Sequence, residues 1–172
     1  MSKELFLIDT NSLITPHNDY YPFDFAPSFW KQMKTHIEAG SIVILDMVRD
    51  EILKRDDNLS RWFRSIEVGR EIDHRQNGIP SVYGKVLQSI QLNPCYRKPV
   101  ALREWSRGTV ADPWLIATAS VYEYTIITLE IANANLNAKD PSKKPKIPNV
   151  AADFGVKVEN LYYMMRALNF RL

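Results

Sequence analysis

Short apolar runs with polar residues at their ends recur along the chain. LFLI at 5–8, SIVIL at 41–45 and TIIT at 125–128 carry, apart from serine and threonine, only apolar side chains. Runs of this length without polar alternation are typical of strands covered on both faces, as in a parallel sheet. We therefore predict three buried strands at these positions.

Helical spacing fills the segments between these runs. Within residues 26–40, Phe29, Met33 and Ile37 recur every four residues before Gly40, which predicts a helix joining the first two strands. Further helices are expected at 47–55, 58–75, 80–92, 111–124, 150–155 and 160–168, with a last strand at 156–158. This alternation predicts an α/β fold, a three-layer α/β/α sandwich with a mostly parallel central sheet.

Composition is that of an ordinary globular protein. The 172 residues are 45% hydrophobic and 24% charged, so residues 1–172 are expected to form a single domain with a helical lobe over 58–107. Lys plus Arg number 22 against 20 for Asp plus Glu, so net charge alone indicates no nucleic-acid partner. The apolar runs are too short to cross a bilayer. Cys95 is the only cysteine, which excludes an internal disulfide and favours a cytoplasmic protein.

Four acidic residues lie near the ends of the predicted strands. Asp9 ends the first strand, and Glu51 lies in the helix after the second. Asp112 starts the helix before the third strand, and Glu130 follows that strand. Ligands bind at the carboxyl ends of parallel strands, so we expect these carboxylates to converge there. Clustered carboxylates need a neutralising cation, and oxygen ligands suit Mg²⁺ or Mn²⁺, whereas the three histidines lack zinc-site spacing.

Each acid also has a purely structural interpretation. Asp112 could cap its helix, Glu51 could pair with Arg55, and Asp9 could start a polar turn. Asp50 is a rival to Glu51 because it lies next to it in the same helix. Asp9 is the hardest to explain in this way, because the Asp-Thr-Asn-Ser run beside a buried strand needs hydrogen-bonding partners.

Several motifs together resemble the PIN-domain nucleases, especially the small VapC-like toxin ribonucleases of prokaryotes. FLIDTNSLI (6–14) resembles the family's opening strand with its first metal-binding Asp, and VRDEIL (48–53) the helix with its second acid. ADPWLIATA (111–119) is similar to the A-D-x-x-I-A-x-A segment, and IITLE (126–130) to the strand-end T-x-D. The main departure is Glu130, which stands where Asp is usual.

The resemblance implies a metal-dependent endoribonuclease with Mg²⁺ or Mn²⁺ as cofactor. The implied catalytic and metal-binding residues are Asp9, Glu51, Asp112 and Glu130. The side chains that would orient them are those of Thr10, Asn11, Ser12, Thr128 and Asn149. The implied partners are RNA, an antitoxin protein and a second copy of the chain, and residues 131–147 would be an insertion loop.

Basic and aromatic side chains offer surfaces for RNA. Arg103, Arg107, Lys143 and Lys144 are candidates for phosphate contacts, with solvated surface charge as the alternative. The segment DYYPFDFAPSFW (19–30) could stack bases on Tyr20, Tyr21 or Phe23, although packing against the sheet is the simpler expectation for most of these rings.

Two other functions compete with the nuclease. The first is a catalytically inactive PIN-like module that binds RNA or a partner protein, for which Glu130 is the main indication. The second is an Asp-dependent phosphatase, which also places Asp after an N-terminal strand but needs another Asp two residues later. Asn11 occupies that position.

Overall fold

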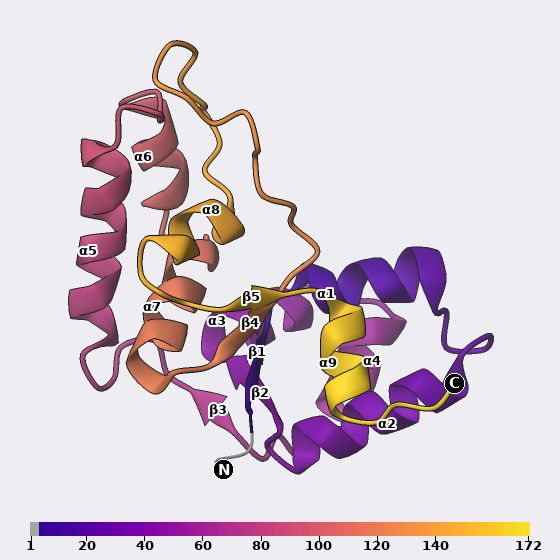
Figure 1. Cartoon of the computed structure of the whole chain (residues 1–172). Helices are drawn as coiled ribbons and strands as arrows, with labels where there is room; N and C mark the ends of the chain where they lie inside the picture. The colour runs from indigo at the N-terminus through magenta and orange to yellow at the C-terminus, as the bar shows by residue number, and fades with distance from the viewer. Residues whose placement is uncertain (1–3) are drawn as a thin grey trace. The chain divides into compact units, whose positions relative to one another are not determined.

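The computed structural model describes residues 4–172 and contains a five-stranded sheet (Figure 1). The strands are β1 (Phe6–Ile8), β2 (Ile42–Leu45), β3 (Glu71–Ile72), β4 (Thr125–Ile127) and β5 (Val158–Glu159). Their order is β3-β2-β1-β4-β5, and β1 pairs in parallel with both β2 and β4, as β2 does with β3. The predicted fold class is confirmed: α/β with a mostly parallel central sheet, of the three-layer α/β/α kind.

Helices separate the strands along the chain. They are α1 (Asn11–Thr15), the π-helical turn η1 (Pro16–Tyr20), α2 (Pro27–Glu38), α3 (Asp46–Leu53), α4 (Asn58–Arg64), α5 (Ile79–Leu92), α6 (Val100–Trp105), α7 (Asp112–Tyr122), α8 (Ile147–Ala152) and α9 (Leu161–Ala167). Proline occupies the first or second position of α2, α5, α7 and α8. Proline suits these positions because an N–H in the first turn of a helix has no acceptor within the helix, so its absence costs no hydrogen bond.

The chain forms two compact units that alternate along the sequence. The first comprises the residues up to Asp73, Thr125–Leu129 and Glu159–Leu172, and the second comprises His74–Tyr124 and Glu130–Val158. The single domain predicted over 1–172 stays a prediction, and its residues 1–3 lie outside the described part of the chain.

The first unit has its core around the predicted apolar runs. All three residues of β1, all four of β2 and all three of β4 are buried. Helix α2 buries Phe29, Met33 and Ile37, the side chains on its predicted apolar face. The helices α1 and η1, which follow directly on β1, were not predicted.

The helix predicted over 58–75 is wrong in its second half. Helix α4 ends at Arg64, and the chain forms β3 at Glu71–Ile72. After α4 the chain packs against the end of α2 instead: the N–H of Gly69 donates to the carbonyl of Ile37 at 3.1 Å, and a Cβ at Gly69 would lie 2.0 Å from the carbonyl oxygen of Glu38. The chain therefore runs too close to α2 for any residue with a side chain.

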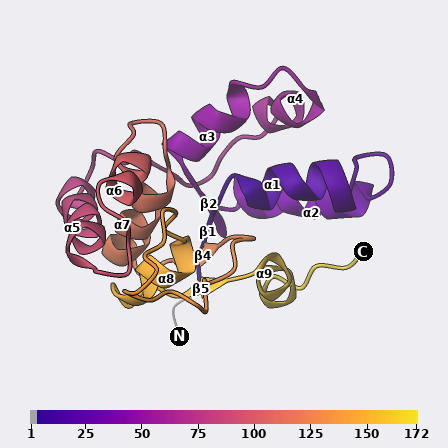
Figure 2. The same ribbon diagram turned by 90° about the horizontal axis from the view of Figure 1, so that it is seen from above.

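The second unit is built around α5 and α7, which lie side by side (Figure 2). The rings of Tyr83 in α5 and Trp114 in α7 stack with centroids 3.7 Å apart. The predicted insertion, residues 131–147, is irregular up to the start of α8, and Ser142 forms an isolated parallel bridge with Tyr96. Within residues 4–172, no helix has the length and hydrophobicity needed to cross a membrane.

Candidate active site

Polar side chains follow four neighbouring strands of the sheet where each strand ends. Asp9 follows β1, Asp46 follows β2, Asp73 follows β3 and Thr128 follows β4. Asp9 is 4% exposed, Asp46 8% and Thr128 2%. The carboxyl ends of parallel strands lie at one edge of a sheet, which is where α/β folds bind their ligands. This edge of the first unit therefore carries a row of mostly buried carboxylates.

Asp9 is held in place by the end of β4. The hydroxyl of Thr128 donates to Asp9 Oδ2 at 2.8 Å, and the backbone N–H of Asp9 donates to the carbonyl of Ile127 at 2.9 Å. The hydroxyl of Ser12 donates to the same carbonyl at 3.2 Å. Of the side chains predicted to orient the acids, Thr128 therefore contacts Asp9, whereas Ser12 contacts the backbone.

Glu51 lies next to the polar segment that follows β1. The hydroxyl of Thr10 donates to Glu51 Oε2 at 2.7 Å. The expected alternative, a pair between Glu51 and Arg55, is wrong because Arg55 pairs with Asp57 at 2.7 Å.

The rival acid Asp50 has a different partner. Its carboxylate accepts from Arg49, with N–O distances of 2.9 and 2.8 Å. The hydrogen bond with Asp50 raises the pKa of Arg49, burial acts in the opposite direction, and the charges of Glu71, Asp50 and Asp46 raise it further. Of the two neighbouring acids, Glu51 is therefore the one bonded to the Asp-Thr-Asn segment.

Asp46 and Asp73 were not among the predicted site residues. Each offers a carboxylate oxygen within 4.8 Å of the other, and His74 is the next residue in the sequence after Asp73. Asp46 follows a buried strand just as Asp9 does, but it is also the first residue of α3, where its carboxylate accepts from the N–H of Met47 at 2.8 Å. Asp73 had no usable signal, because β3 is only two residues long.

Asp112 and Glu130 line one hollow within the second unit. Its volume is about 180 Å³, and its lining residues are Glu104, Trp105, Val110, Asp112, Glu130, Lys144, Pro145 and Lys146. Asp112 is the first residue of α7. The hollow combines three acidic side chains with two basic ones, a mixture that suits a cation and a phosphate together.

Glu130 has two partners from its own chain. Lys146 Nζ donates to one carboxylate oxygen at 2.8 Å, and the backbone N–H of Ile147, the first residue of α8, donates to the other at 2.7 Å. Glu130 therefore anchors the start of α8, and a metal ion at this carboxylate would have to displace Lys146.

The other predicted residues have these places. Asn149 exchanges hydrogen bonds with the backbone of Asn133, at 2.8 and 3.2 Å. Asn11 is exposed at the start of α1, and Arg103 and Lys143 are exposed as well. Arg107 pairs with Glu104 at 3.0 Å, and Lys144 lines the hollow.

Most of the donors that could hold a metal are carboxylate oxygens. The first unit offers Asp9, Glu51, Asp46 and Asp73, and the second offers Asp112 and Glu130, together with the imidazole nitrogen of His74. Oxygen donors fit Mg²⁺ and Mn²⁺, whereas an imidazole ligand also suits transition metals.

Comparison with curated proteins gives no significant match, and comparison with solved structures gives none either. One family model, described as "Domain of unknown function (DUF4411)", matches residues 6–172. The chain therefore belongs to the DUF4411 family.

Proposed function

We propose that this protein is a divalent-metal-dependent endoribonuclease in which Asp9, Glu51, Asp112 and Glu130 serve the hydrolysis of RNA phosphodiesters. The observation that supports this most directly is Asp9, a buried carboxylate at the end of the central strand, oriented by the hydroxyl of Thr128. Burying carboxylates is costly, and a row of them at the ends of β1, β2 and β3 attracts a cation.

The chain's own residues have distinct roles in this proposal. Thr128 and Thr10 fix the orientation of Asp9 and Glu51 through the hydroxyl bonds described above, and such supporting bonds tune metal ligands. Lys144 and Arg103 bind phosphates of the substrate. When bound, Mg²⁺ or Mn²⁺ supplies an activated water and positive charge that stabilises the phosphodiester during attack.

The test is cleavage of single-stranded RNA by the purified protein with Mn²⁺ or Mg²⁺. We expect cleavage that EDTA stops and that Asp9→Asn lowers by at least about 100-fold. Glu67→Gln is the matched control, since Glu67 is an exposed acid of the same unit, and it should cleave like the wild type. Full activity of Asp9→Asn would overturn the proposal.

The ion pair between Lys146 and Glu130 favours a second candidate, the inactive module that binds RNA or a partner. In that case Lys146 replaces the metal permanently, and the wild-type protein binds RNA without cutting it in Mn²⁺. Cleavage that depends on Asp9 would exclude this candidate.

We also propose that the nuclease is the toxin of a prokaryotic toxin–antitoxin pair acting on cytoplasmic RNA. This follows from the resemblance of the FLIDTNSLI and ADPWLIATA segments. Its partner would be an antitoxin encoded by an adjacent small gene, with a second copy of the chain as a further partner. Growth arrest on expression, relieved by that neighbour and absent for Asp9→Asn, is the expected result.

A further inference from the structure

A second hollow lies entirely within the first unit, and none of the acids of the candidate active site lines it. Its volume is about 550 Å³, and it is lined by His17, Asn18, Pro22, Phe23, Asp24 and Asn58. These residues come from η1, the loop before α2 and the start of α4. Hollows of this size are typical of sites for small organic groups.

One wall of the hollow is an aromatic ring with fixed neighbours. The ring of Phe23 lies 4.7 Å from that of Trp30 and 5.8 Å from that of Trp62, measured between centroids. The ring of His17 contacts it edge-on at 5.0 Å. Because Phe23 is already ordered by three rings, a flat ligand stacked on it would not have to immobilise it.

The polar lining combines amides with a carboxylate. The Oδ1 of Asn18 lies 2.9 Å from His17 Nδ1, and the Oδ1 of Asn58 accepts from Arg61 at 2.6 Å. The amide oxygens are therefore engaged, so the two amides can present their Nδ2 groups as donors. Asp24, which is exposed, adds a pure acceptor.

This set matches the edges of one nucleobase. A carboxylate accepts best from two adjacent N–H groups, and guanine carries such a pair at N1 and N2, whereas its O6 and N7 accept from amide donors. Adenine, cytosine and uracil lack the adjacent pair of donors. In a duplex this edge is used for base pairing, so the base must be unpaired.

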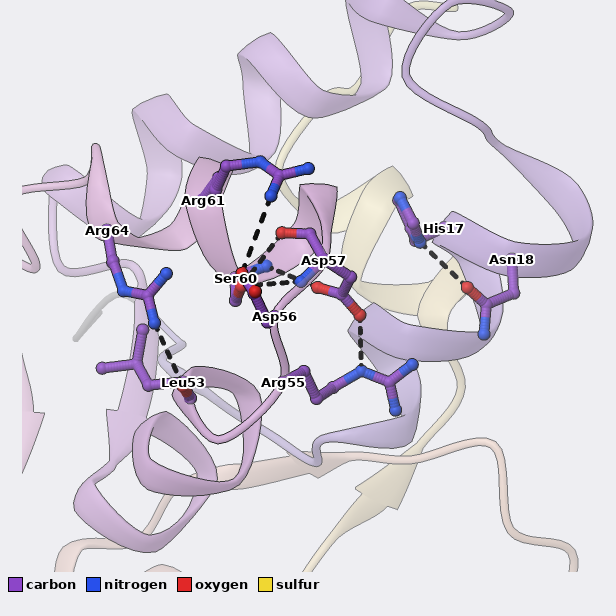
Figure 3. A network of polar contacts seen from close by, with 9 residues as sticks. All are labelled: His17, Asn18, Leu53, Arg55, Asp56, Asp57, Ser60, Arg61 and Arg64. Atoms are coloured by element: carbon purple, nitrogen blue, oxygen red, sulfur yellow. Dashed lines mark hydrogen bonds and ion pairs between the residues drawn. The ribbon is translucent and has the colours of Figure 1, made fainter.

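Arginines beside the hollow suit the phosphates of an RNA strand. Arg55 and Arg61 lie on either side of Asp57, between Ser60 and the pair His17 and Asn18 (Figure 3). Arg64 lies on the other side of Ser60 and donates to the carbonyl of Leu53. Arg61 is 61% exposed, and its ion pair with the fully accessible Asp56 spans 3.7 Å. Exposed pairs of this kind are weak, so Arg61 can exchange Asp56 for a phosphate.

We propose that this hollow binds an unpaired guanine base of an RNA strand. Phe23 stacks on the base, Asp24 accepts from N1–H and N2–H, Asn18 and Asn58 donate to O6 and N7, and Arg61 contacts a neighbouring phosphate. The inference rests on the proposed function only in taking RNA as the ligand, and it requires no cleavage.

The experiment measures binding in EDTA, so that cleavage plays no part. Tryptophan fluorescence is the readout, because Trp30 and Trp62 touch Phe23. The probes are short oligouridines with one central guanosine, adenosine or uridine, together with free guanosine monophosphate. We expect the guanosine oligomer to bind the wild type at least about tenfold more tightly than the other two.

Variants of the lining residues test whether the preference for guanosine arises in this hollow. Asp24→Asn should bring the guanosine preference to within about threefold, and Phe23→Leu should weaken all oligomers. Asp19→Asn is the control, since Asp19 is an exposed acid of η1 outside the lining, and it should bind like the wild type. Circular dichroism checks that each variant is folded.

Three results would overturn the inference: equal binding of all oligomers, an unchanged guanosine preference in Asp24→Asn, or tighter binding of the free nucleotide than of the oligomer. None of them affects Asp9-dependent cleavage, so the proposed function could survive this failure. Conversely, guanosine-selective binding without any cleavage would leave the inference intact and remove the nuclease.

Discussion

Glu130 is the predicted metal ligand whose structural role can be measured separately. Its carboxylate accepts from Lys146 Nζ and from the N–H of Ile147. The Lys146 and Glu130 side chains are 39% and 20% exposed, so their ion pair contributes about 0.5–1 kcal/mol. The bond to the first N–H of α8 resembles a helix cap and contributes about 1 kcal/mol.

These magnitudes give a graded series of variants. Glu130→Ala removes both bonds and should lower the free energy of unfolding by about 1.5–2 kcal/mol. Glu130→Gln keeps an acceptor for Ile147 and Lys146→Met removes only the ion pair, so each should cost about 0.5–1 kcal/mol. Urea unfolding in EDTA measures all three. If Glu130→Gln costs as much as Glu130→Ala, the bond to α8 does not carry the stability assigned to it.

Adding Mn²⁺ to the same series tests whether Glu130 also binds metal. A ligand that binds only the native state raises its stability by mass action. Lys146→Met frees the carboxylate, so it should respond to about threefold to tenfold less Mn²⁺ than the wild type, while Glu130→Gln should respond less. Lys143→Met, which removes an exposed lysine of the same loop, is the control. Equal Mn²⁺ responses in all variants would exclude Glu130 as a ligand.

Five further substitutions test other parts of the fold and site. Asp57 caps α4: burial acts to raise its pKa, but hydrogen bonds from the Ser60 N–H and from Arg55 lower it overall. The ionised carboxylate therefore stabilises the native state at pH values above the usual aspartate pKa, and this stabilisation is lost as the pH falls through the lowered pKa. Asp57→Ala should accordingly lower the free energy of unfolding by about 1 kcal/mol near neutral pH and by clearly less in acid. Thr118→Val should raise stability by about 1 kcal/mol, because the buried hydroxyl of Thr118 has no hydrogen-bond partner among residues 4–172; a loss in thermal unfolding would contradict this. Gly69→Ala should cost about 1–3 kcal/mol or more because its Cβ would meet the carbonyl of Glu38. Gly84→Ala should stabilise by about 0.5–1 kcal/mol, because in the described part of the chain the added Cβ meets nothing within 4 Å beyond the neighbouring backbone of its own helix. Thr128→Val should lower RNA cleavage about 10–100-fold, since it removes the hydroxyl that orients Asp9, and should cost about 1–3 kcal/mol in urea unfolding because that hydrogen bond is buried; unchanged cleavage would show that this bond is dispensable.

Hydrophobic patterns within single segments of the sequence were enough to predict three strands and the helix α2. The apolar runs at β1, β2 and β4 and the four-residue spacing in α2 are visible in the sequence because each element buries its own residues. The strand β3 is two residues long and exists because β2 pairs with it. No local pattern could show it, and the helix predicted through 58–75 was wrong there.

In the candidate site, too, some residues could be identified from local sequence signals and others could not. Asp9 was recognisable because a polar segment directly follows a buried strand, whereas Thr128 was predicted only through the resemblance of IITLE to the T-x-D segment. Asp46 carried the same signal as Asp9, but its position at the start of a helix gave it a simpler explanation. The pair of Glu130 and Lys146 depends on a loop folding back on itself, which side-chain spacing alone does not reveal.

The first unit combines segments from the beginning, middle and end of the chain, so it can be completed only late in synthesis. The N–H of Thr128 donates to the carbonyl of Glu159 at 3.2 Å, and the Thr128 hydroxyl holds Asp9. The support of Asp9 therefore includes residues that leave the ribosome some 150 positions after it. Under the proposed function, a nascent chain would therefore carry an incomplete catalytic site, and cleavage would begin only after residues 158–159 have been synthesised and have paired with the end of β4.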